Sequence, residues 1–167
     1  MIDLSEFISY LEENFYLISG VPCSYFKEFL AYLDSHRLKT KLRHIYATRE
    51  DEAIGIASGV GFSGKKSVIY LQNSGLGNIG DALTSLSQLY KLPMLLLISY
   101  RGLEPDNEFP EHSIMGEVNE SVLRAFKIPY CDLTEKNWRM EIKNAIKKMN
   151  EASSPVALLV KKGVLCQ

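Results

Sequence analysis

The chain has 167 residues, a formal net charge of -1 and 46% hydrophobic residues. A chain of that size buries roughly two thirds of the surface that it exposes when unfolded, so we expect one domain spanning residues 1–167. The near-neutral charge argues against a broad nucleic-acid surface, because such surfaces show a basic excess. No stretch of about 18 apolar residues is present, so no membrane span is expected.

The first segment and the cysteines bear on the cellular setting. The sequence MIDLSEFISYLEENF is acidic and amphipathic, and it lacks the basic start and apolar block of a signal peptide. Cys23, Cys131 and Cys166 are scattered and odd in number, with neither metal-ligand spacing nor a disulfide framework. We therefore expect a reduced, cytoplasmic setting and no metal ligands on this chain.

Helix-like and strand-like apolar spacing alternates along the chain. In chain order we expect a helix at 4–15, a strand at 17–21, a helix at 24–36, a strand at 44–47, a helix at 50–62 and a strand at 67–71, then a helix at 81–90, a strand at 94–99, a polar loop at 100–116, a helix at 120–126, a strand at 128–132, a helix at 138–150 and a strand at 156–160. Ser24 and Thr48 are the candidate N-caps of the second and third helices. This alternation predicts a doubly wound α/β fold with a mostly parallel sheet of about six strands.

Ligands of such sheets bind beyond the carboxyl ends of the strands. The loops that follow Val21, Ala47, Leu71 and Ser99 are therefore the places where functional residues are expected. The segment YATREDEAIGIASGV puts Glu50 at the first turn of a helix rich in small residues, which lets another helix or a flat ligand pack closely. Acidic residues also favour helix N-termini through the dipole alone, so Glu50 can be catalytic or simply stabilising.

Three further segments carry candidate residues. The run QNSGLGN follows a strand and opens a helix, so it can cradle a phosphate or serve as a tight turn; it is neither a Walker loop nor a dinucleotide fingerprint. Cys23, in GVPCSYF, is interpreted as a buried or ligand-loop cysteine rather than a nucleophile. In the polar loop, Arg101 can hold an anion and His112 can titrate near neutrality, although a solvated histidine is the more common case. His36 and His44 are interpreted as structural.

Taken together and in this order, these segments resemble the pyrimidine-binding domain of thiamine diphosphate enzymes, and most of all phosphonopyruvate decarboxylase and the sulfopyruvate decarboxylase alpha subunit. The matching stretches, which are spread over residues 20–163, are GVPCSYFKEFL, ATREDEAIGIASGV, YLQNSGLGNIGDALTSL, LPMLLLISYRG and SSPVALLVKKG. The resemblance implies the thiamine diphosphate-binding fold of the pyrimidine-binding type. It also implies decarboxylation of a 2-keto acid that carries a second anion at C3, phosphonate or sulfonate.

The resemblance assigns roles to particular residues. It implies that Glu50 is the catalytic glutamate, which bonds the pyrimidine N1′ of the cofactor and favours its imino tautomer. The other expected cofactor-binding residues are Pro22, Gln72, Asn73, Ser74, Gly75 and Asn78. The expected substrate-binding residues are Cys23, Ser24, Arg101 and His112.

The family also needs a diphosphate-binding domain that begins with GDG, and no GDG occurs in this chain. The resemblance therefore implies a beta subunit that holds Mg²⁺ and the diphosphate of thiamine diphosphate, in an α2β2 or larger assembly. Three other interpretations stay open: a nucleotide- or phosphate-binding module, a regulatory or scaffold subunit, and a subunit of a thiamine-dependent carboligase.

Overall fold

The computed structural model describes residues 1–103 and 109–165. The chain forms the following helices and strands: α1 Leu4–Asn14, β1 Leu17–Gly20, α2 Lys27–Ser35, β2 Arg43–Tyr46, α3 Glu50–Phe62, β3 Ser67–Gln72, α4 Leu76–Asp81, β4 Met94–Ser99, α5 Ser113–Ala125, β5 Tyr130–Leu133, α6 Trp138–Ala152 and β6 Val156–Val160. Short 3-10 helices precede α2, α4 and α5 at Ser24–Phe26, Asn73–Gly75 and Pro110–His112, and a π-helical segment, η3, continues α4 over Ala82–Gln88.

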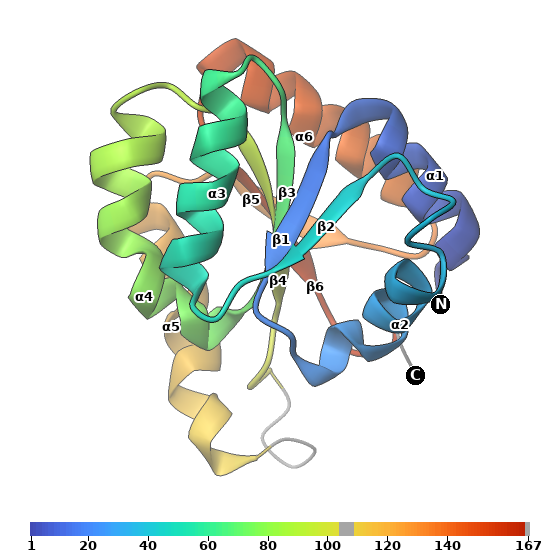
Figure 1. Cartoon of the computed structure of the whole chain (residues 1–167). Coiled ribbons are helices and arrows are strands. Elements are labelled where there is room, and N and C mark those ends of the chain that lie inside the picture. Colours follow the sequence, from blue (N-terminus) through green and yellow to red (C-terminus); the bar gives the residue numbers. More distant parts are fainter. Residues whose placement is uncertain (104–108, 166–167) are drawn as a thin grey trace.

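The six strands form one parallel sheet in the order β2-β1-β3-β4-β6-β5. Helices cover both of its faces (Figure 1), with α3, α4 and α5 on one side and α1, α2 and α6 on the other. The predicted doubly wound α/β fold is therefore confirmed, and the sheet is parallel throughout the described residues. From β1 the chain first moves outward to β2 and then returns to add β3 on the opposite side of β1.

Alternating side chains of the central strands supply the two hydrophobic cores. Val68 and Tyr70 of β3 point to the core under α1, α2 and α6, whereas Ile69 and Leu71 point to the core under α3, α4 and α5. Strands with both faces covered are nearly continuous apolar runs, which explains the unbroken apolar run from Met94 to Ile98 in β4. In the described residues, no helix has the length and apolar character that crossing a membrane requires.

The segment between β4 and β5 differs from the prediction of a polar loop at 100–116 followed by a short helix at 120–126. The structure begins α5 at Ser113, and this helix has 13 residues. Its buried side includes Gly116, Asn119 and Leu123, at spacings of three and four residues. Because a glycine and an asparagine occupy two of these buried positions, the helical periodicity is hidden from a count of apolar residues.

The candidate N-caps Ser24 and Thr48 were also wrong. Cys23 and Arg49 occupy the positions before the 3-10 helix and α3, and neither provides a side-chain cap. The Thr48 hydroxyl instead donates to Glu52 Oε2 at 2.7 Å. The Thr48 hydroxyl thus donates to a side chain of the first turn, whereas an N-cap hydroxyl accepts from a backbone N–H.

Candidate functional site

The residues predicted for the site gather at the carboxyl ends of β1, β2, β3 and β4. The strand order reverses between β1 and β3, because the connections that leave these two strands run in opposite directions. Such a reversal opens a crevice beyond the strand ends, and ligands of doubly wound sheets bind there. Helix α3 packs against both β1 and β3, so its first residue, Glu50, reaches this crevice although β2 lies at the sheet edge.

Glu50 lies against the helix that follows β3. Its Oε2 accepts a hydrogen bond from Asn78 Nδ2 at 2.8 Å. A β-carbon built on Gly75 would lie 2.6 Å from Cγ of Glu50, so the carboxylate arm fills the space that any other residue at 75 would need. Glu50 is partly buried, and its Oε1 has no hydrogen-bond partner among the described residues.

This contact explains one glycine of the QNSGLGN run. The run is helical from Asn73 onward, so it is not the glycine turn that the sequence left open. Gly75 lies in ordinary right-handed helical conformation, with φ -66 and ψ -13. The glycine is therefore required by the close approach of Glu50 rather than by an unusual backbone angle.

The two acidic neighbours of Glu50 are engaged elsewhere. Asp51 forms an ion pair with Arg49 at 3.0 Å, and this contact lowers the pKa of the Asp51 carboxyl. Glu52 accepts from the hydroxyl and the backbone N–H of Thr48, and the hydroxyl contact is the main cause that lowers its pKa. Of the three acidic residues in the first turn, Glu50 alone extends to the loop after β3.

A second group of predicted residues surrounds Gln72, the last residue of β3. Gln72 Nε2 donates to Ser74 Oγ at 2.8 Å and lies 3.5 Å from His112 Nδ1. His112 reaches this position because the chain after β4 crosses α5 closely. A β-carbon on Gly116 would lie 2.3 Å from the carbonyl oxygen of Gly102. Gly102 itself has a positive φ of 83, a backbone conformation that favours glycine.

A third group centres on Arg101, just after β4. Its carbonyl oxygen accepts from Asn73 Nδ2 at 2.8 Å, and its guanidinium donates to Ser24 Oγ at 3.2 Å. The guanidinium also lies 5.1 Å from the centre of the Tyr25 ring, within cation–π range. Asn73 is fully buried, and its Oδ1 has no hydrogen-bond partner in the part of the chain that the structure describes. Arg101 is thus held by residues from two other strand ends.

Cys23 lies beside the same strand end. Its thiol donates to Ser99 Oγ at 3.1 Å, and burial raises its pKa above the ordinary value, with the hydrogen bond to Ser99 opposing the shift. A raised pKa disfavours the thiolate, in agreement with the interpretation that Cys23 is not a nucleophile. Pro22, Cys23 and Ser24 line a groove of about 530 Å³ that continues between α2 and the end of β2.

The structure thus joins the predicted residues into three contact groups: Glu50 with Gly75 and Asn78, Gln72 with Ser74 and His112, and Arg101 with Asn73 and Ser24. The short Asn73–Gly75 helix connects them, because it contributes to each group. Pro22 and Cys23 precede Ser24, and within the described residues their side chains form no hydrogen bond to the other predicted residues. Sequence reasoning missed Tyr25 and Ser99 as neighbours of this site, although both stand next to segments that it selected. The structure also shows His44 buried, with its ring bonded to Tyr70, as expected of a structural histidine.

The described residues contain no cluster of three or more His, Cys, Asp or Glu side chains that could hold a metal ion.

No family model matches the chain. The sulfopyruvate decarboxylase subunit alpha of Methanocaldococcus jannaschii is 38% identical over 149 residues, which cover 89% of this chain and 86% of that protein. The subunit of the same name from Methanococcus maripaludis is 33% identical and covers 90% of this chain and 88% of its own.

Two further comparisons extend the similarity. Phosphonopyruvate decarboxylase of Streptomyces viridochromogenes is 30% identical over 74% of this chain, but over only 28% of its own length. Among solved structures, the thiamine diphosphate-dependent 4-hydroxybenzoylformate decarboxylase of Rhodococcus jostii RHA1 matches 95% of this chain with a TM-score of 0.72 at 19% identity, and this likeness confirms the expected fold. The chain belongs to the family of the sulfopyruvate decarboxylase alpha subunits.

Proposed function

We propose that the chain is the pyrimidine-binding subunit of a thiamine diphosphate-dependent decarboxylase that converts sulfopyruvate to CO2 and the corresponding aldehyde. The contact of Glu50 with Gly75 and Asn78 carries this proposal. It holds one carboxylate at the crevice between β1 and β3, and the carboxylate oxygen Oε1 has no partner among residues 1–103 and 109–165. Sulfopyruvate is preferred to phosphonopyruvate because the sulfopyruvate alpha subunits match over most of their length.

The residues present fit a bound pyrimidine ring. Glu50 Oε1 is an acceptor without a protein partner among the described residues, and Asn73 Oδ1 is a fully buried acceptor without one. The partly buried Glu50 oxygen suits a nitrogen donor of a heterocycle, because a buried polar atom without a partner costs about 1–3 kcal/mol. When bound, thiamine diphosphate supplies the electron sink that decarboxylation of a 2-keto acid needs.

Glu50 is the residue that moves a proton in this proposal. Its carboxyl group shares a proton with a ring nitrogen, and Asn78 fixes the orientation of the other carboxylate oxygen. Acid–base assistance of this kind contributes about 10²–10⁴-fold to a rate. The neighbours Asp51 and Glu52 cannot take over this role, because their carboxylates bond to Arg49 and Thr48.

Arg101 is proposed to recognise the sulfonate of the substrate. Tyr25, Ser24 and Asn73 fix its guanidinium and its backbone, so the charge is positioned before the substrate arrives. A guanidinium suits an anion with several oxygens, because its N–H groups can donate to two of them at once. His112 and Cys23 are proposed to border the same substrate position.

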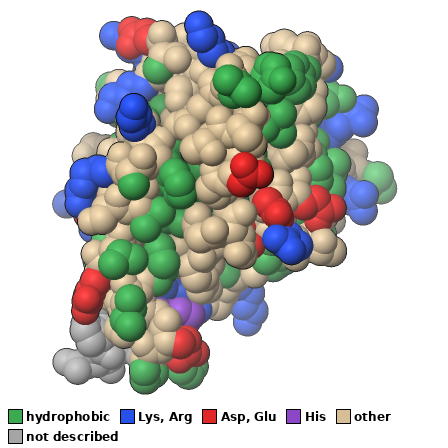
Figure 2. Space-filling model, turned by 90° about the vertical axis from the view of Figure 1, so that its left-hand side faces the viewer, with side chains coloured by type: hydrophobic (Ala, Val, Ile, Leu, Met, Phe, Trp, Pro, Cys, Tyr) green, Lys and Arg blue, Asp and Glu red, His purple; other side chains and the backbone are tan. Residues whose placement is uncertain are grey.

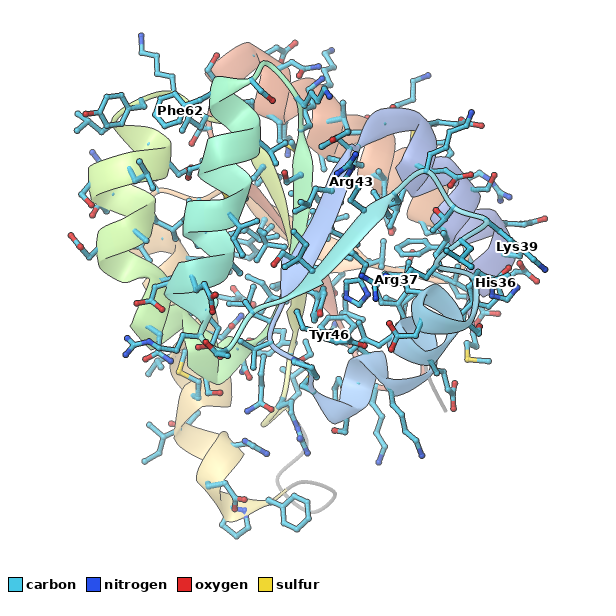
Figure 3. The ribbon with its side chains drawn as sticks, in the orientation of Figure 1. His36, Arg37, Lys39, Arg43, Tyr46 and Phe62 are labelled. Atoms are coloured by element: carbon cyan, nitrogen blue, oxygen red, sulfur yellow. The ribbon has the colours of Figure 1, made fainter. Side chains whose placement is uncertain are left out.

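A beta subunit is proposed to supply Mg²⁺ and to hold the diphosphate, and it needs a surface on which to dock. The outer side of α3 provides one: Gly55 and Gly59 are exposed, and a β-carbon at either position would meet no atom within 4 Å. Figure 2 shows this side of the molecule, where green hydrophobic side chains lie among tan backbone and uncharged polar groups, with several charged side chains between them. At the far end of α3 from Glu50 (Figure 3), Phe62 and Tyr90 pack edge to face at 5.5 Å and remain 60% and 56% exposed. Contiguous exposed apolar groups mark interaction surfaces.

The test is an assay of this chain reconstituted with a subunit that carries the diphosphate-binding domain, in the presence of thiamine diphosphate, magnesium and either keto acid. We expect Glu50→Gln to fold normally and to lose about 10²-fold or more of kcat. The matched control is Asp51→Asn, which removes only an exposed ion pair and is expected to keep its activity. Near-normal turnover of Glu50→Gln would reject the proposal, and faster turnover of phosphonopyruvate would reassign the substrate.

A further inference from the structure

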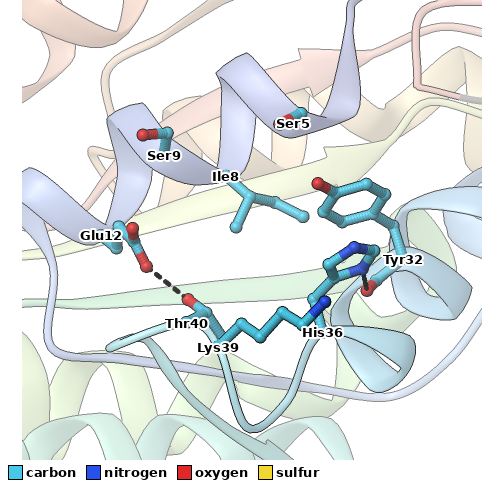
Figure 4. A pocket seen from close by; sticks show the side chains of 8 residues that line it. All are labelled: Ser5, Ile8, Ser9, Glu12, Tyr32, His36, Lys39 and Thr40. Atoms are coloured by element: carbon cyan, nitrogen blue, oxygen red, sulfur yellow. Dashed lines mark hydrogen bonds between the residues drawn. The ribbon is translucent and has the colours of Figure 1, made fainter.

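A separate cavity of about 160 Å³ lies between α1 and the connection from α2 to β2 (Figure 4). The connection starts where α2 ends and leads to the first residue of β2, so the cavity lies toward the amino ends of the strands. The candidate site occupies the carboxyl ends. Figure 3 shows His36 and Lys39 at this connection, away from Tyr46 at the end of β2.

A fixed carboxylate forms one end of this cavity. Glu12 Oε2 accepts from Thr40 Oγ1 at 2.5 Å and from the backbone N–H of Lys41 at 3.0 Å. These two bonds hold the carboxylate in place and leave Oε1 without a partner in the described part of the chain. Neither partner is a charged side chain, so the negative charge of Glu12 stays available to a bound cationic group.

A cation and an oriented ring form the opposite end. Lys39 has no ion pair within the residues that the structure describes, and its side chain runs along the cavity toward His36 in Figure 4. The His36 ring stacks on Tyr32, with centroids 4.0 Å apart and an angle of 10° between the planes. Its Nδ1 lies 3.0 Å from the carbonyl oxygen of Tyr32 and 2.9 Å from Ser35 Oγ, and these contacts fix the orientation of the ring. The ring is a rigid wall beside the flexible ammonium.

Hydroxyl groups line the space between the two ends. Ser5 and Ser9 are one turn apart on α1, and neither hydroxyl has a hydrogen-bond partner among the described residues. The Tyr32 hydroxyl likewise has none there, and the buried side chain of Ile8 provides an apolar wall. Hydroxyls can donate or accept, so they suit a ligand with polar groups of both kinds.

We propose that this cavity binds a small zwitterion of amino-acid size, with its carboxylate toward Lys39 and its ammonium toward Glu12. The two opposite charges at the two ends are the reason for this choice. A simple anion such as phosphate would be attracted by Lys39 and repelled by Glu12. A simple cation would be attracted by Glu12 and repelled by Lys39. Such repulsion against the wrong partner is a common source of specificity.

Titration calorimetry on the full-length chain tests the proposal with a series of amino acids of increasing length. Glycine, β-alanine and 4-aminobutyrate carry the same two charges at increasing separation, so the tightest of them reports the spacing of the two ends. We expect one of them to bind with a Kd of about 1 mM or tighter. Acetate, ammonium and inorganic phosphate should each bind at least about tenfold more weakly. Absence of amino-acid binding, or equal binding of phosphate, would overturn the proposal.

A pair of lysine variants separates a built site from general charge attraction. Lys39→Ala is expected to weaken binding of the best probe at least about tenfold. Lys41→Ala removes the same charge two residues away, from a side chain that does not line the cavity, and should leave the Kd unchanged. Both positions are exposed, so neither change threatens folding. Equal effects of the two variants, or no effect of Lys39→Ala, would contradict a site at this place.

Discussion

The carboxylate arm of Glu50 lies so close to the α-carbon of Gly75 that a β-carbon there would come within 2.6 Å of Glu50 Cγ. The two residues are 25 positions apart and belong to different helices, α3 and the short helix before α4. We therefore expect Gly75→Ala to displace the Glu50 side chain from the crevice and to lower kcat of the reconstituted enzyme about tenfold or more, because a small misplacement at a reacting centre is costly.

The matched control for this change is Gly77→Ala in the same run. A β-carbon on Gly77 would meet no atom within 4 Å, and the residue is helical and exposed. The isolated chain with Gly77→Ala should fold at least as stably as the wild type. Steady-state kinetics of both variants, with circular dichroism as the check of folding, measures the difference. An equal loss of kcat in the two variants would show that the close contact of Glu50 with Gly75 does not matter for activity.

Alanine in place of either exposed glycine of α3 is expected to raise the stability of the chain and to weaken its assembly with the partner. Glycine within a helix costs about 0.8–1.0 kcal/mol relative to alanine, so Gly55→Ala and Gly59→Ala should each raise the free energy of unfolding of the isolated chain by up to that amount. If α3 is the docking surface for the partner, the added methyl groups should weaken binding of the beta subunit. Denaturant titration measures the expected gain in stability, and a binding measurement with the beta subunit measures the expected loss of affinity. Unchanged partner affinity would remove α3 from the proposed interface.

His44 predicts a pH dependence of stability. Burial lowers its pKa below the ordinary 6.5, and the nearby Asp34 carboxylate offsets this only in part. The unfolded chain therefore binds more protons at this residue than the folded chain does. As the pH falls below about 6.5, protonation of His44 in the unfolded chain lowers the free energy of unfolding. We expect His44→Gln to be less stable than the wild type at pH 8, because its bond to Tyr70 is altered, but to lose less stability between pH 7 and pH 5. Urea midpoints at several pH values measure this, and parallel curves would contradict it.

Cys23 predicts slow alkylation of the native chain. Its raised pKa keeps the thiol protonated, and its side chain is only partly exposed. Reaction with iodoacetamide at pH 8 should be slower than that of free cysteine and should reach the same rate once the chain is unfolded in guanidinium chloride. Peptide mass spectrometry follows Cys23 separately from Cys131, whose pKa burial also raises, and from Cys166, which lies outside the described residues. A fast native reaction at Cys23 would show that the thiolate is accessible.

Local sequence patterns were sufficient for the layers of this fold and for the position of Glu50. The strand β4 is apolar from Met94 to Ile98 because both faces are covered, and helices such as α1 and α6 carry a visible apolar stripe. Periodicity of this kind is a property of neighbouring residues, so it can be read without knowing the fold. The length of α5 was missed because Gly116 is buried against Gly102 and the polar residue Asn119 occupies a buried position, and neighbouring residues reveal neither.

The amino-acid sequence by itself determined the parallel α/β class, the strand ends at which the candidate site residues lie, and a glutamate at the first turn of α3. Only the tertiary structure decided which residues meet there. It brought Gly75 against Glu50, Tyr25 beneath Arg101, and Gly116 against Gly102. It also placed Glu12 and Lys39 at two ends of one cavity. These pairs are fixed by the order of strands and the packing of helices, which depend on contacts between residues far apart in the chain.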